Sequence, residues 1–101
     1  MEKNIEISML LDIYGELLTD KQKDVLDLYY NQDLSLAEIA DEAGITRQGA
    51  RKILVDGEKN LLDVESKLKI LHKKLKNEKI IEELIKETED VNFKEKLKKL
   101  L

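Results

Sequence analysis

The sequence contains no cysteine and no proline, and its single histidine, His72, is the only imidazole that a metal site could use. Without cysteine, neither a disulfide nor a thiolate metal site is available, and a reducing cytoplasm is the expected compartment. The four glycines are isolated from one another, so there is no glycine-rich loop of the kind that holds phosphate. We therefore expect no metal and no cofactor.

Long hydrophobic runs are also missing, which excludes a membrane span. The first 18 residues, MEKNIEISMLLDIYGELL, carry acids throughout their apolar stretch and lack a basic leader before a small-residue cleavage site. They do not have the pattern of a signal peptide. Acidic pairs such as Glu82-Glu83 and Glu89-Asp90 are typical of exposed helix surfaces. No catalytic constellation is visible, and the sequence is not expected to be an enzyme.

Charged residues make up 40% of the chain, with almost no strand-like alternation, which indicates an all-α, cytoplasmic protein of one compact unit. The charge is uneven. Residues 1–66 hold seven Lys or Arg against fifteen Asp or Glu, whereas residues 67–101 hold eleven Lys against seven acids. An electrostatic partner should therefore avoid the acidic N-terminal body, unless the lysines of the last third simply form a solvated helix face.

Apolar residues spaced three and four apart predict a first helix over residues 5–18.

Three polar residues are predicted to begin the helices that follow it. Thr19 with Gln22, and Ser35 with Glu38, have the spacing of a capping box, in which each side chain bonds the other residue's backbone N–H. Thr46 is placed to cap a further helix through its hydroxyl.

Residues 36–54, LAEIADEAGITRQGARKIL, have the pattern of a helix-turn-helix motif. Gly44 stands where the first helix must end in a left-handed conformation, which glycine adopts without steric cost. Ala40 lets the second helix cross closely, and Ile45 fills the corner between the two. The predicted structural positions of the motif are Ile39, Ala40, Gly44, Ile45, Ala50 and Ile53.

The second helix of the motif carries the side chains that could contact DNA, which are Thr46, Arg47, Gln48, Arg51 and Lys52. Arginine can bind guanine or phosphate with two parallel hydrogen bonds, and glutamine can do the same to adenine. Lysine and a threonine hydroxyl suit phosphate. The chain has sixteen lysines but only two arginines, and both arginines are on this helix.

Acidic residues near this helix oppose that interpretation. They are Glu38, Asp41, Glu42, Asp56 and Glu58. The alternative for Arg47 is an ion pair with Asp41 or Glu42 that only solubilises the surface. Because counterion release supplies most non-specific affinity for DNA, so few net positive charges predict weak, salt-sensitive binding by a single copy.

A heptad pattern follows the motif and predicts one long helix that ends at Asn77. The apolar seam comprises Ala50, Leu54, Gly57, Leu61, Val64, Leu68, Leu71 and Leu75. Gly57 could mark a bend or a break in it. The seam predicts either packing within the chain or a homodimer through Leu54, Leu61, Val64, Leu68, Leu71 and Leu75.

Two further helices are expected after the seam, the second capped by Asn92. The expected organisation is a helix-turn-helix domain over residues 1–60 and a helical extension over residues 61–101. The extension would either complete the same compact unit or serve dimerisation.

Residues 18–58 resemble the promoter-reading fourth region of bacterial sigma factors, in which a capped helix precedes an S-L-x-E-I-A helix and an S/T-R-Q recognition start. The segment LLDIYGELLTDKQKDVLDLYYNQDLSLAEIA resembles more closely the YlxM-type family of small bacterial proteins. In this resemblance Thr46, Arg47 and Gln48 match the family's S-R-Q. The family often has a basic pair where this chain has Val55 and Asp56.

The resemblance implies a sigma region 4-like helix-turn-helix bundle, with a long helix after the motif and C-terminal helices. It also implies a link to the signal recognition particle pathway, beside whose genes such proteins are usually encoded. Two functions follow as expectations. One is a DNA-binding regulator. The other is an interaction module that acts on the protein or RNA of the targeting particle without binding DNA.

Overall fold

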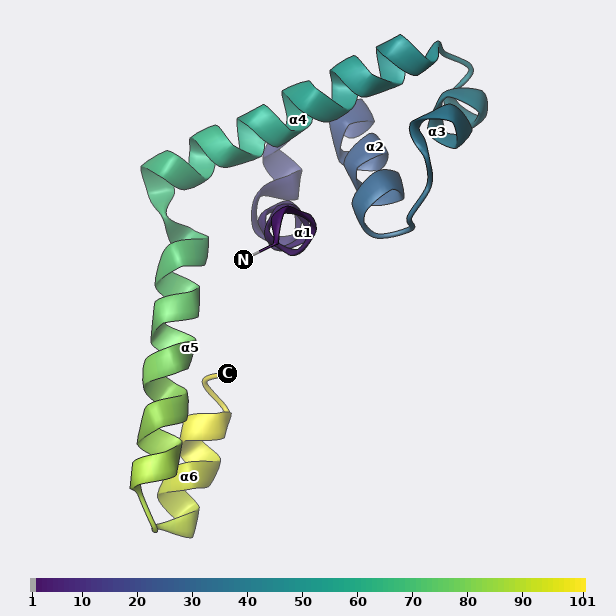
Figure 1. Cartoon of the computed structure of the whole chain (residues 1–101). Helices are drawn as coiled ribbons and strands as arrows, with labels where there is room; N and C mark the ends of the chain where they lie inside the picture. The colour runs from purple at the N-terminus through teal and green to yellow at the C-terminus, as the bar shows by residue number, and fades with distance from the viewer. Residues whose placement is uncertain (1) are drawn as a thin grey trace. The chain divides into compact units, whose positions relative to one another are not determined.

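All the regular secondary structure is helical over the residues that the computed structural model describes, 2–101 (Figure 1). The elements in order are α1 (Lys3–Tyr14), the 3-10 turn η1 (Gly15–Leu17), α2 (Asp20–Tyr30), α3 (Leu36–Ala43), α4 (Arg47–Leu68), α5 (Ile70–Glu87) and α6 (Val91–Lys98). They form two compact units, and the chain passes from the first to the second after Lys69. The predicted all-α fold class is confirmed. None of the described helices is both long and apolar enough to cross a membrane.

The predicted helix starts at Thr19, Ser35 and Thr46 are confirmed. Thr19 Oγ1 accepts a hydrogen bond from the backbone N–H of Gln22 at 3.1 Å, and the Gln22 side chain accepts one from the N–H of Thr19. Ser35 and Glu38 make the same reciprocal pair. Each cap supplies partners for N–H groups that the first turn of a helix leaves without intrahelical acceptors.

The core of the first unit lies where α4 crosses α1, α2 and α3 (Figure 1). Side chains from all four helices are buried in it: Ile7, Leu10, Leu11, Tyr14, Val25, Leu26, Ile39, Ala40, Ala50, Leu54 and Leu61. Burial of a large apolar side chain contributes about 1.5–3 kcal/mol relative to leaving it exposed. This packing holds the start of α4 in place against α3.

Gly57 lies inside α4, which continues through it as one helix, so the break considered there is absent. The residue is buried where α4 passes α2. A Cβ atom added to it would stand 2.8 Å from Leu26 Cδ1 and 3.4 Å from Gln22 Cβ. The glycine is there because α2 side chains occupy the space that a larger residue would need.

The long helix predicted to run to Asn77 ends earlier, at Leu68. Lys69 has the left-handed backbone conformation, with φ +56°, and its N–H bonds Glu65 O at 2.8 Å. A new helix, α5, begins at Ile70 and runs through Asn77 to Glu87. The continuous heptad seam is therefore wrong, because the left-handed residue interrupts the helical register.

This break also corrects the predicted dimer surface. Leu54 and Leu61 are buried in the core of the first unit, with 5% and 0% of their surface exposed. Val64 and Leu68 belong to α4, whereas Leu71 and Leu75 belong to α5. The six leucine and valine positions thus do not form one exposed helix face.

The predicted domain boundary after residue 60 falls within α4, and the two compact units instead divide after Lys69. The second unit, Ile70–Leu101, consists of α5 and the shorter α6, which contact each other. The residue that caps α6 is Asp90, whose Oδ1 accepts the Phe93 N–H at 3.1 Å, and not Asn92, which lies within the helix.

Candidate nucleic-acid interface

The turn between α3 and α4 has the geometry expected from Gly44. This residue is left-handed, with φ +68° and ψ +33°. The Gly44 N–H bonds Asp41 O at 3.4 Å, and the following Ile45 N–H bonds Ala40 O at 3.0 Å. These bonds satisfy carbonyl groups at the end of α3 and turn the chain directly into α4.

Three of the six predicted structural positions of the motif are buried. Ile39 and Ala50 have no exposed surface, Ala40 is 4% exposed, and Ile53 is half-buried. The close crossing expected above Ala40 is consistent with this burial. Ile45 differs, since 38% of its surface remains exposed and it fills the corner only in part.

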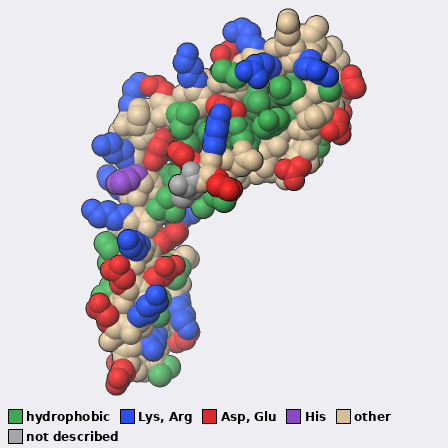
Figure 2. Space-filling view, viewed as in Figure 1, with side chains coloured by type: hydrophobic (Ala, Val, Ile, Leu, Met, Phe, Trp, Pro, Cys, Tyr) green, Lys and Arg blue, Asp and Glu red, His purple; other side chains and the backbone are tan. Residues whose placement is uncertain are grey.

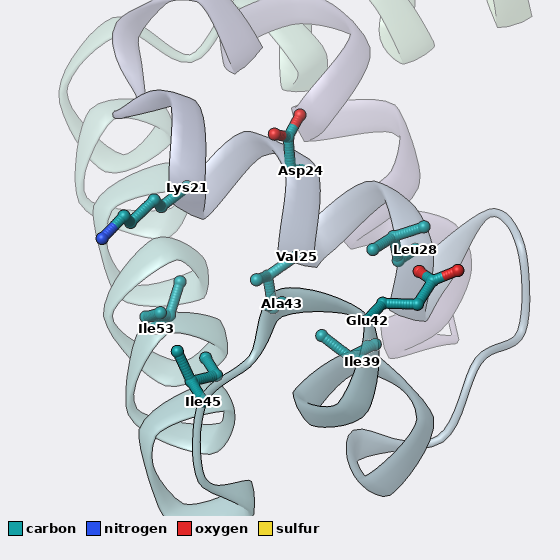
Figure 3. Close-up of a pocket in the computed structure, with 9 residues that line it drawn as sticks. All are labelled: Lys21, Asp24, Val25, Leu28, Ile39, Glu42, Ala43, Ile45 and Ile53. Carbon is teal, nitrogen blue, oxygen red and sulfur yellow. The ribbon is translucent and has the colours of Figure 1, made fainter.

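The exposed side of Ile45 belongs to a pocket that sequence reasoning missed. The pocket measures about 300 Å³ and lies among α2, α3 and the start of α4 (Figure 3). Its lining residues are Lys21, Asp24, Val25, Leu28, Ile39, Glu42, Ala43, Ile45 and Ile53. The pocket brings together positions 21 to 53, so no local sequence pattern could have revealed it.

Thr46 caps α4 as predicted. Its Oγ1 accepts the Gly49 N–H at 3.0 Å. The hydroxyl proton is still available for donation, because a hydroxyl can donate one hydrogen bond while accepting others. The N–H groups of Arg47 and Gln48 belong to the first turn, which has no intrahelical acceptors, and such groups favour anions such as phosphate.

Arg47 and Arg51 are both exposed and stand one helical turn apart at the beginning of α4. Neither makes an ion pair with another residue in the described part of the chain. The ion pair considered for Arg47 with Asp41 or Glu42 is absent from these contacts. Both guanidinium groups can therefore meet a partner without first losing an intrachain carboxylate. Lys and Arg side chains line the edge that α4 forms in Figure 2.

Lys52 differs from the two arginines. Its Nζ lies 3.2 Å from Asp56 Oδ2, one turn further along α4. The Lys52 side chain is largely exposed and that of Asp56 is half-buried, so the pair contributes only a few tenths of a kcal/mol to the helix. Its main effect is on charge, since Asp56 offsets the positive charge of Lys52 next to Arg51.

Glu58 is not part of the surface around the arginines. Tyr30 Oη donates a hydrogen bond to Glu58 Oε1, and Lys3 Nζ lies 3.1 Å from Glu58 Oε2. Burial, and then the hydrogen bond to this carboxylate, raise the pKa of Tyr30 well above its usual range. Glu58 is close to the recognition residues in the sequence, but its contacts link α4 to α1 and α2.

Glu38 is similarly committed to structure. Hydrogen bonds from the backbone N–H and the side chain of Ser35 hold the pKa of Glu38 below its usual value. The charged Glu38 side chain therefore stabilises the first turn of α3.

Within residues 2–101, no group of three or more His, Cys, Asp or Glu side chains is placed to hold a metal ion.

Comparison with known proteins gives one family over the full length. Residues 1–101 match a family described as "Putative helix-turn-helix protein, YlxM / p13 like". A UPF0122 protein of Clostridium botulinum is 43% identical over 109 residues, which cover 99% of this chain and all of that protein. One from Clostridium perfringens is 45% identical, covering the whole chain and 91% of the relative. One from Clostridium kluyveri is 54% identical over 73% of this chain and 67% of the relative.

The family expected from the sequence is thus confirmed by a match over every residue. The capped α3, the left-handed Gly44 and the packed start of α4 are the structural counterpart of the family's description. The chain belongs to the YlxM/p13-like family of helix-turn-helix proteins, UPF0122.

Proposed function

We propose that this protein is a DNA-binding regulator that reads the major groove with the start of α4. The observation that carries the proposal is the pair Arg47 and Arg51, exposed, one turn apart and free of ion pairs in the described residues. In helix-turn-helix proteins the first residues of the second helix contact base edges. We assign base contacts to Arg47, Gln48 and Arg51, and phosphate contacts to Thr46 and Lys52.

The electrostatics predict that one copy binds weakly. Residues 1–66 hold eight more acids than basic residues, and Lys52 is offset by Asp56. Few phosphates would be neutralised, so the non-specific contribution to affinity is small. Most of the affinity would then come from the specific contacts of a few side chains.

A selection experiment tests this proposal. The tagged protein is incubated with a pool of random duplexes, and bound sequences are amplified and read. We expect a short enriched motif, lost in Arg47→Ala/Arg51→Ala. The matched control is Lys59→Ala/Lys67→Ala, which removes two positive charges from exposed positions further along α4. Failure of the wild type to enrich any motif, or equal enrichment by the arginine variant, would contradict the proposal.

The second candidate is an interaction module of the signal recognition particle pathway that acts on the particle's protein or RNA. The acidic first unit favours it, because such a surface repels nucleic acid except near the arginines. The pathway itself is inferred from the family resemblance. Affinity capture from the source cells, with and without nuclease, separates the two functions: nuclease-resistant recovery of the particle's protein supports the module, and salt-sensitive recovery of defined DNA supports the regulator.

A further inference from the structure

The second unit leaves much of its apolar surface uncovered. Of its large hydrophobic residues, Leu71 and Leu97 are buried, whereas those at least 39% exposed are Ile70, Ile80, Leu84, Val91, Phe93, Leu100 and Leu101. A unit of 32 residues made of two helices is too small to build a sufficient core by itself. Such units are commonly completed by association, and the exposed face of α5 has a pattern that identifies the partner.

That face is a stripe of residues spaced four, three, four and three apart, which places them along one side of the helix. Its members, called here the α5 stripe, are Lys73, Asn77, Ile80, Leu84 and Glu87. All five are exposed. Three members of the stripe, Lys73, Asn77 and Ile80, also line an open hollow of about 810 Å³ together with the C-terminal Leu100 and Leu101.

Charges of opposite sign occupy the two ends of α5. Residues 70–79 contain four lysines and one glutamate, whereas residues 80–87 contain three glutamates and one lysine. On the α5 stripe, Lys73 and Glu87 are equally distant in sequence from Ile80, seven residues on either side. Neither charge forms an ion pair with another described residue. Lys76 and Glu83 add the same signs next to the stripe.

We infer that the partner of this face is a second copy of the same chain, packed antiparallel so that the two α5 stripes meet at Ile80. Two-fold symmetry around Ile80 places Lys73 of each copy opposite Glu87 of the other, with the apolar Ile80 and Leu84 and the uncharged Asn77 between these charged ends. A parallel arrangement would bring lysine against lysine and glutamate against glutamate, which is unfavourable. The charge pattern of α5 therefore selects both the partner and its direction.

This dimer differs from the one expected from the heptad pattern over residues 54–75, because it uses a different face of α5, centred on Ile80, and none of the residues buried in the first unit. It does not depend on the proposed function. If the chain does bind DNA, the dimer supplies two recognition helices, which offsets the weak affinity expected of one copy.

Charge reversal in the full-length protein tests the inference, with mass measured by sedimentation equilibrium. The first variant, Glu83→Lys/Glu87→Lys, makes both ends of α5 basic. The second, Lys73→Glu/Lys76→Glu, makes both ends acidic. We expect each variant alone to self-associate at least about tenfold more weakly than the wild type, since like charges then face each other at both ends.

An equimolar mixture of the two variants should form a heterodimer about as tight as the wild-type dimer, because every facing pair is again of opposite sign. Circular dichroism establishes that each variant is folded. Lys96→Glu/Lys99→Glu, which alters α6 and the residue that follows it, outside the stripe, should dimerise like the wild type. A wild type that stays monomeric at about 100 μM, a range in which weak interfaces form, would overturn the inference. So would reversed variants that dimerise as well alone as when mixed.

Discussion

Gly57 of α4 and Leu26 of α2 are so close that the structure has no room for a side chain at position 57. A Cβ there would stand 2.8 Å from Leu26 Cδ1, and Leu26 is completely buried. Gly57→Ala should therefore destabilise the protein by about 1 kcal/mol or more, since overpacking exceeds the gain from replacing a helical glycine.

Urea unfolding measures this effect, and Lys59→Ala, at an exposed position of the same helix, serves as the control. Adding Leu26→Ala to Gly57→Ala tests the contact itself. If the two residues interact as described, the double variant should lose less stability than the sum of the single ones. A Gly57→Ala protein more stable than the wild type would show that α2 and α4 are not packed this closely.

Substitution of Gly44 should also destabilise the protein, but for a different reason. Its φ is +68°, but an added Cβ would meet no atom within 4 Å. The cost of Gly44→Ala is therefore that of the backbone conformation alone, about 1–2 kcal/mol. Gly44→Asn should cost less, because asparagine adopts this conformation more readily than alanine. Thermal unfolding of the two variants provides the comparison, and equal stability of both with the wild type would contradict the left-handed turn.

The capping box of α3 predicts a pH dependence. Hydrogen bonds from Ser35 lower the pKa of Glu38 in the folded state. A carboxyl whose folded pKa lies below its unfolded value, about 4.3, contributes stability above that value and loses it as the pH falls through the folded pKa. Glu38→Gln keeps an acceptor for the Ser35 N–H but does not titrate. Stability of this variant should fall less between pH 6 and pH 3, roughly the range over which carboxylates titrate.

Glu16 has a lowered pKa as well, caused by its hydrogen bond and charge interaction with Lys23. The Glu38→Gln variant should thus retain part of the acid sensitivity of the wild type. NMR titration of the Glu38 side chain assigns the contribution directly. A midpoint at or above the value of an ordinary glutamate would refute the capping-box account.

Asp56 is expected to limit DNA binding by offsetting Lys52. Asp56→Asn preserves the shape of the side chain and removes its charge, so it should raise affinity for duplex DNA by a factor of about 2–10. Asp63→Asn is a closely matched control, because Asp63 forms an equivalent pair with Lys67 at 3.1 Å further along α4. Equal effects of both substitutions would mean that only the net charge matters, and not the position of Asp56.

Local signals made the starts of α2, α3 and α4 and the end of α3 predictable. Thr19, Ser35, Thr46 and Gly44 act through neighbours within a few residues, and the structure places each of them as expected. Family membership and the all-α class followed from the same segments. The side chains proposed for DNA binding lie together on one exposed helix start, although their contact with DNA stays a prediction.

The features that were mispredicted or missed depend on distant contacts or on unmarked backbone changes. Lys69 interrupts the long helix, although no glycine or proline stands at that position to indicate a break. Gly57 looked like a helix breaker because its partner, Leu26, is 31 residues earlier in the sequence. Glu58 seemed to oppose DNA binding, and only the fold brings it to Tyr30 and Lys3.

The central claim is that Arg47 and Arg51 bind DNA, and a titration by fluorescence anisotropy with a selected duplex tests it most directly. Loss of both arginines should weaken binding by about a hundredfold or more, since a bidentate contact to a base is worth roughly 1–3 kcal/mol. Lys59→Ala/Lys67→Ala should weaken it only a few-fold. If the folded Arg47→Ala/Arg51→Ala protein binds the duplex as tightly as that control does, the account of this helix as a DNA-reading element is wrong.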